Sequence, residues 1–128
     1  MSVILAEGAP TSILFRNNLV AYGEYGIIGA GTAPGSGTLS QYFPGSVVTG
    51  NVFFKEQVGF QSPYPPGNTY VTTAQVKFVA PGERNWRLRE DSQFRCRATD
   101  GKDVGVDFTE LIAALEGNSQ LLVPSKPQ

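Results

Sequence analysis

The sequence predicts an all-β fold with one short helix near its C-terminus, and three observations carry that prediction. Short runs rich in β-branched and aromatic residues recur along the 128-residue chain. The 15 glycines and 9 prolines are spread between these runs and are not gathered in one linker. Only one stretch has apolar residues at helical spacing. A chain of this length forms one domain or part of one, so the sequence predicts a single domain over residues 1–128.

The predicted strands follow one another between the glycine and proline turns. They cover residues 12–21, 46–54, 68–73, 74–79 and 94–98. The predicted helix carries apolar residues at i, i+3, i+4 and i+7, which are Phe108, Leu111, Ile112 and Leu115. Asp107 is placed to cap the start of this helix, and Gly117 follows its end.

Asparagines recur at matching places in the predicted strands. When residues 13–20 are laid over residues 47–53, Asn18 falls on Asn51, and Asn68 marks a weaker third copy. An asparagine suits a left-handed corner between two strands, and stacked asparagine amides can bond each other in a ladder. Three ordinary hairpin turns are the alternative, because the intervals of 33 and 17 residues are unequal.

Composition excludes several function classes. With 10 basic and 11 acidic residues and a net charge of -1, the chain lacks the positive field that non-specific nucleic-acid binding needs. Because it contains no histidine, mechanisms and metal sites that require a histidine of this chain are excluded. Its single cysteine, Cys96, cannot form a disulfide within the chain, and its place in a predicted strand between two arginines indicates a small buried side chain.

The sequence predicts neither a membrane-spanning segment nor a signal peptide. No apolar run approaches the roughly 20 residues that span a bilayer. The first eight residues are apolar for only four positions and have no basic flank, so we expect no signal peptide there.

A series of short segments carries a resemblance to a known family. The series runs through Phe15-Arg16-Asn17-Asn18-Leu19-Val20, Val48-Thr49-Gly50-Asn51-Val52-Phe53 and Tyr64-Pro65-Pro66-Gly67-Asn68. It closes with Trp86-Arg87-Leu88, Asp91-Ser92-Gln93-Phe94, and Thr99-Asp100-Gly101-Lys102-Asp103-Val104-Gly105-Val106-Asp107 before the short helix. In this order, from about residue 12 to 116, the chain resembles the C-terminal portion of right-handed parallel β-helix proteins, the pectate-lyase-like family.

The resemblance implies a right-handed parallel β-helix, a solenoid of which this chain would be the last few coils. The coils would cover about residues 12–98, a terminal Asp-Gly turn and helix about 99–117, and a tail 118–128. Residues 29–45, dense in glycine and serine, would form an excursion from the coil. The first coil would present an open sheet edge, so the expected partner is the upstream coils of a longer parent chain or a neighbouring subunit.

The function implied by the resemblance is that of non-catalytic C-terminal coils and a cap in a secreted, carbohydrate-associated protein, located outside the cell or at its surface. One alternative is part of a polysaccharide lyase or glycoside hydrolase cleft acting on acidic polysaccharide. That alternative lacks support from the residues, because no matched pair of acid and base groups can be assigned. Another alternative is a small all-β viral or assembly protein whose open edge is filled by a neighbouring subunit.

Four residues are candidates for binding polysaccharide. Arg87 and Arg89 alternate in sequence and would share one face of a strand, where they could hold an anionic sugar. Tyr42 and Tyr64 stand beside prolines and could offer flat rings to a sugar. Solvated ion pairs and ordinary loop anchors are the alternative roles of these side chains.

One cluster of carboxylates raises the question of calcium, which family members often hold with acidic residues. Asp100, Asp103 and Asp107 are the candidates, with Glu110 nearby, but their spacing is not that of an EF-hand loop. A structural role is favoured, with Asp100 in a turn before Gly101 and Asp107 as a helix cap. Apart from this calcium candidate, no cofactor is expected.

Overall fold

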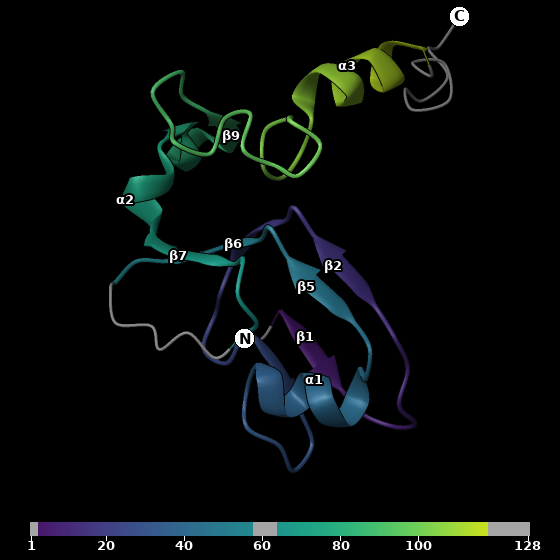
Figure 1. The fold of residues 1–128 in the computed structure, drawn as a ribbon. Helices are drawn as coiled ribbons and strands as arrows, with labels where there is room; N and C mark the ends of the chain where they lie inside the picture. The colour runs from purple at the N-terminus through teal and green to yellow at the C-terminus, as the bar shows by residue number, and fades with distance from the viewer. Residues whose placement is uncertain (1–2, 58–63, 118–128) are drawn as a thin grey trace, which may run out of the picture.

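The computed structural model describes residues 3–57 and 64–117 of the chain, and Figure 1 shows their arrangement. The strands there are only three or four residues long, and short helices interrupt their succession. The strands are β1 (Ile4–Ala6), β2 (Leu14–Arg16), β3 (Leu19–Ala21), β4 (Ile27–Gly29), β5 (Val47–Thr49), β6 (Val52–Lys55), β7 (Thr69–Thr72), β8 (Phe78–Ala80) and β9 (Asn85–Leu88). The helices are α1 (Ser36–Tyr42), α2 (Thr73–Val76) and α3 (Phe108–Gly117), with a 3-10 turn at Pro81–Glu83.

The strands of residues 3–57 and 64–117 form four small sheets. Three sheets are parallel, with strand orders β1-β4, β2-β5 and β3-β6-β7, and the fourth pairs β8 with β9 in antiparallel fashion. Leu14 lies opposite Val47, and Leu19 lies opposite Val52. We call β1, β2 and β3 the first layer and their partners β4, β5 and β6 the second layer.

The predicted fold class, an all-β right-handed parallel β-helix, is wrong. The structure is a small mixed α/β domain with separate parallel and antiparallel sheets, and its described residues form no solenoid and no closed β-helix. Helix α1 interrupts the strands after β4, α2 follows β7 directly, and the turn at Pro81–Glu83 reverses the chain so that β9 returns antiparallel to β8. The repeated asparagines indicated parallel pairing but could not report these local reversals.

One predicted strand is wrong in its first half and another throughout. Residues 74–76 belong to α2, because Thr72 and Gln75 form a reciprocal capping box and Lys77 ends the helix in a left-handed conformation, and only Phe78 and Val79 lie in a strand, β8. Residues 94–98 form turns, and Cys96 in them has φ 55 and is exposed, not buried. The backbone N–H of Cys96 donates to Asp103 Oδ1, and this contact fixes the turn.

The C-terminal helix is confirmed. Helix α3 covers Phe108–Gly117, and Asp107 Oδ1 accepts a hydrogen bond from the backbone N–H of Glu110 at 3.0 Å, as an N-cap does. The segment 29–45 contains α1, which packs on β4 through the buried Thr38 and Leu39. The predicted tail, 118–128, lies outside the described residues.

Two apolar clusters lie on opposite faces of the β3-β6-β7 sheet. On one face Phe53, fully buried, packs against the side chains of β4 and β5 and the rings of Tyr22 and Tyr64. On the other face Val52 and Val71 pack with the C-terminal half of the chain, a cluster completed by Val76, Phe78, Phe94, Ala98 and Val104. Strand β6 is therefore covered on both faces, because its successive side chains point in opposite directions.

Candidate interaction surface

A ladder of asparagine side chains runs across the parallel strands. Asn18 donates its Nδ2 hydrogen to Asn51 Oδ1 at 3.0 Å, and Asn51 donates in the same way to Asn68 Oδ1 at 3.0 Å. The backbone N–H groups of Asn18 and Asn51 donate to the same two oxygens. The left-handed residue of each corner is the one before the asparagine, namely Asn17, Gly50 and Gly67. The asparagines that repeat in the sequence therefore form the ladder, and the residue before each of them takes the left-handed conformation.

The end of the ladder at Asn68 is closed. Asn68 Nδ2 donates to Val48 O at 2.9 Å and to Pro65 O at 3.0 Å, so both of its amide hydrogens have acceptors. Pro65 O thereby takes the place that a further asparagine oxygen would occupy.

The end of the ladder at Asn18 is open. Its Nδ2 group bonds Asn51 and the carbonyl of Arg16, two residues earlier in the same corner. Asn51 instead reaches back across the layer to Phe15 O at 2.8 Å. Among the residues that the structure describes, no donor bonds Asn18 Oδ1, the atom that corresponds to the doubly bonded oxygens of Asn51 and Asn68.

The strand edges beside Asn18 are open as well. Within the described chain, β1, β2 and β3 each pair on one side only. Val47 N donates to Ile13 O and Asn17 N donates to Thr49 O, so alternate backbone groups of β2 face β5. The N–H and C=O groups of Leu14 and Arg16 consequently point away from β5, toward the open edge.

Core-facing side chains of the first layer are less covered than their partners in the second. Phe15 and Val20 are only partly buried, whereas Val48 and Phe53 opposite them are 3% and 0% exposed. Ile4 of β1 is likewise only partly buried, whereas Ile27 opposite it in β4 is buried. The apolar interior therefore continues to the open edge without a cover, and a further strand layer would bury it.

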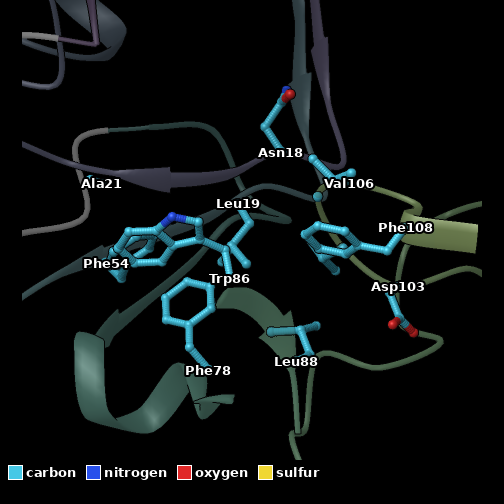
Figure 2. A pocket seen from close by; sticks show the side chains of 12 residues that line it. Asn18, Leu19, Ala21, Phe54, Phe78, Trp86, Leu88, Asp103, Val106 and Phe108 are labelled. Atoms are coloured by element: carbon cyan, nitrogen blue, oxygen red, sulfur yellow. The ribbon is translucent and has the colours of Figure 1, made fainter. Parts of the chain in front are cut away.

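A groove of about 440 Å³ lies on the other face of β3. Its walls are mostly apolar, and Figure 2 shows Trp86 and Phe54 on one side of Leu19, with Val106 and Phe108 on the other. Phe78 meets Trp86 edge to face at a centroid distance of 5.1 Å. Residues of β3, a strand whose edge is open, therefore also line the groove.

The two candidate arginines have different surroundings. Arg87 lies over the ring of Phe108, 4.9 Å from its centroid. Arg89 follows β9 and pairs with Asp91 at 3.2 Å, and Lys77 holds the same carboxylate. Hydrogen bonding from Lys77 lowers the pKa of Asp91. The structure therefore places Arg87 and Arg89 in separate contacts and not around one hollow.

The two candidate tyrosines are engaged in the fold. The Tyr42 hydroxyl donates to Ala30 O at 2.7 Å, and its ring leaves no room for a Cβ atom at Gly29. Tyr64 is 5% exposed, and its ring stacks on Phe53 at 4.7 Å. Both rings thus contact the protein itself.

Each candidate carboxylate has a protein partner. Asp100 accepts from the N–H of Lys102 in the turn that contains Gly101, and Asp103 pairs with Arg95 at 3.6 Å. Asp107 caps α3, and the backbone N–H of Glu110, with help from Lys102, lowers the pKa of Asp107. No group of three or more acidic or cysteine side chains that could hold a metal ion is found among residues 3–57 and 64–117.

The open edge was anticipated from the sequence only in general terms, and its residues were not. Ile4, Phe15 and Val20 belong to short apolar runs whose lack of cover becomes visible only when the strands are paired. Leu19 and Val106 of the groove gave no signal beyond their apolar character.

Comparison with protein-family models, curated proteins and solved structures gives no match. Within the part of the chain that the structure describes, no helix has the length and apolar character needed to cross a membrane.

Replacing Tyr64 by phenylalanine tests its buried hydroxyl. This hydroxyl accepts the backbone N–H of Ile27 at 2.8 Å, and burial raises its pKa above the ordinary value of 10.0. We expect Tyr64→Phe to lower the free energy of unfolding by about 1–3 kcal/mol, because the Ile27 N–H loses its acceptor. Urea titration followed by circular dichroism measures this loss.

The same variant has an expected pH dependence. Because the pKa of Tyr64 is raised by folding, its neutral form stabilises the protein fully below pH 10 and that contribution is lost as pH rises further. The stability of Tyr64→Phe should therefore fall less steeply above pH 10 than that of the parent chain. Tyr25→Phe is the control, because Tyr25 is 45% exposed and the hydrogen bond with Glu24 that mainly raises its pKa is open to solvent, so this variant should change stability far less than Tyr64→Phe. Equal losses in the two variants would contradict the role given to Tyr64.

Proposed function

We propose that this chain is a non-catalytic interaction module that receives a further layer of parallel strands from another polypeptide segment along β1, β2 and β3. The observation that carries the proposal is the open end of the asparagine ladder at Asn18 Oδ1, placed beside unpaired strand edges and a partly buried apolar interior. Strand addition to an open edge supplies main-chain hydrogen bonds and lets alternate side chains enter the core.

The ladder defines the chemistry of the partner. The side-chain oxygens of Asn51 and Asn68 each accept from the asparagine of the preceding layer, so a segment added before Asn18 must bring N–H donors to its Oδ1. A strand, an asparagine corner and a second strand supply those donors together with apolar side chains for Phe15 and Val20. The partner is therefore a polypeptide of the pattern seen in β5 and β6.

The Asn68 end of a second copy does not meet this requirement. Both Nδ2 hydrogens of Asn68 already bond carbonyl oxygens, so it has none to offer to Asn18 of another molecule. Head-to-tail stacking of identical chains would also leave the ladder broken at each junction. The predicted carbohydrate association and extracellular location stay predictions.

Binding of a peptide tests the proposal. The peptide that copies residues 46–55 contains a strand, the Asn51 corner and a second strand, and it is labelled with a fluorophore for anisotropy titrations against the full chain. We expect saturable 1:1 binding with a dissociation constant of about 1 mM or tighter. The same peptide with Asn51→Asp lacks the side-chain N–H donors and should bind at least about 10-fold more weakly.

Two variants of the full chain locate the bound peptide. Leu14→Pro removes an N–H group that faces the open edge and should weaken binding by about 10-fold or more. Leu14→Thr keeps that N–H and is the matched control, at a position 62% exposed. Circular dichroism confirms that both variants fold. Equal binding by the two variants, or no binding to the parent chain, overturns the proposal. So does a dimer of the parent chain that Leu14→Pro converts to monomers, because a second copy would then occupy the edge.

A further inference from the structure

The C-terminal segment crosses from the second layer to the first and continues beyond it. Val104 packs in the same cluster as Val52 of β6. Gly105 donates to Asn17 O at 2.9 Å, and a Cβ atom on it would lie 2.9 Å from Leu19 Cβ in β3. Val106 and Phe108 come next in the chain and line the groove beside Leu19, on the outward face of β3.

Val106 and the residues of α3 after Phe108 present an apolar surface that the described residues leave uncovered. Val106 is 53% exposed, and Leu111, Ile112 and Leu115 are 41%, 39% and 46% exposed. None of the residues of α3 is buried. Figure 1 shows α3 extending away from the strands.

The start of α3 is nevertheless held firmly. Lys102 bonds Glu110 at 2.6 Å and Asp107 at 3.3 Å, and Asp107 caps the helix. The hydrogen bonds that Lys102 donates to Glu110 and Asp107 raise its pKa, so it stays charged. An isolated helix of this length is marginal in water, and an apolar stripe without a contact adds nothing to its stability. A helix fixed at one end, with an open stripe, is suited to close on a partner.

Strand β6 shows what such a cover does. Its inward residue Phe53 enters one cluster and its outward residue Val52 is buried against the C-terminal segment. On β3, by contrast, the outward-facing Ala21 is exposed and Leu19 is only partly buried, at the floor of the groove. The cover over the outer face is thus complete at β6 and incomplete at β3.

The geometry points to α3 and Val106 as a clamp on the outward face of the strand that pairs with β3. This inference rests on the proposed function and adds a requirement for the partner, whose strand must be apolar on both faces. Inward side chains meet Val20, and outward side chains enter the groove between Trp86 and Phe108 beneath the stripe of α3. A partner strand with apolar side chains on its inward face only would bring no apolar side chain to Val106 and α3.

The peptide of residues 46–55 also tests this inference, because its Val52 and Phe54 occupy the outward positions. The variant Leu111→Glu puts a carboxylate on the stripe, whereas Ala113→Glu puts the same group on the opposite side of α3. Alanine, leucine and glutamate are all good helix formers, so α3 should persist in both, as far-UV circular dichroism checks. We expect Leu111→Glu to weaken peptide binding by about 10-fold and Ala113→Glu by less than about 2-fold.

Coupling between the two molecules identifies the contact. In the peptide, Val52 takes the place opposite Leu19, beside Val106 and Phe108. Val52→Ala should therefore weaken binding to the parent chain by about 10-fold and to the Leu111→Glu chain by much less, because the contact is already lost there. If the peptide binds and Leu14→Pro abolishes binding, but the α3 variants bind like the parent chain, the clamp is overturned and the edge proposal stands. If the parent chain binds no peptide, both are overturned.

Discussion

Replacing Phe53 by alanine should cost more stability than any other single truncation of an apolar side chain in the described core. Phe53 is fully buried, and its ring stacks on Tyr64 at 4.7 Å and on Tyr70 at 5.7 Å. Tyr22 meets it edge to face at 5.9 Å. Removing a ring from such a site loses its transfer free energy and leaves a cavity, so we expect a loss of about 3–5 kcal/mol.

Urea unfolding followed by the fluorescence of Trp86, the single tryptophan, measures this loss. The midpoint should fall while the slope of the transition stays the same, because the folded state remains compact. Leu5→Ala is the control, since Leu5 is 78% exposed, and it should change stability by less than about 0.5 kcal/mol. A loss below about 1 kcal/mol for Phe53→Ala would show that these rings do not form one packed cluster.

Features of the fold that depend on local spacing or on a repeat were accessible from the sequence. Helix α3 has four apolar residues on one face and a capping aspartate, and both properties belong to a single stretch of chain. The asparagine ladder was accessible because stacked strands place like residues side by side, so Asn18 and Asn51 fall at matching positions.

Other features depend on which alternative local conformation prevails. Residues 74–79 have strand-forming side chains, yet the reciprocal hydrogen bonds of Thr72 and Gln75 start a helix there. Cys96 alternates with charged residues as it would in a strand, but it takes a left-handed turn held by Asp103. The fold class was missed for the same reason, because helices and one reversed strand interrupt the parallel pairs.

The candidate site shows a further limit. The sequence predicted an open edge in general, but the acceptor at Asn18 becomes apparent only from the direction of every hydrogen bond in the ladder. The groove beside β3 requires Leu19, Trp86 and Phe108, which are far apart in the sequence and meet only after the C-terminal segment crosses the sheet.

Changing Asn51 to aspartate should destabilise the protein in a strongly pH-dependent way. Asn51 is fully buried, and its Nδ2 group donates to Phe15 O and Asn68 Oδ1. Aspartate has the same shape but, when ionised, has no hydrogen to donate. Phe15 O and Asn68 Oδ1 would then face a buried negative charge. With roughly 1–3 kcal/mol for each unsatisfied group, we expect a loss of at least about 3 kcal/mol at pH 7.

The sign of the pH dependence follows from the same contacts. Burial and the two facing oxygens raise the pKa of the introduced carboxyl above its unfolded value of about 4. The protonated carboxyl can donate one hydrogen bond, so the penalty is smallest below about pH 4 and grows by up to about 1.4 kcal/mol per pH unit until the pH passes the raised pKa. Urea titrations of the variant and the parent chain at matched pH values separate this effect from the titration of the other carboxylates.

Asn85→Asp provides the matched control. The side chain of Asn85 accepts a hydrogen bond from the N–H of Arg87 through Oδ1, an acceptor that aspartate keeps. This variant should therefore differ from the parent chain by less than about 0.5 kcal/mol, with no comparable dependence on pH. If Asn51→Asp were equally mild, or if its penalty shrank as the pH rose, the amide hydrogens of Asn51 would not be holding the two layers together, and the open acceptor at Asn18 would lose its meaning as a binding site.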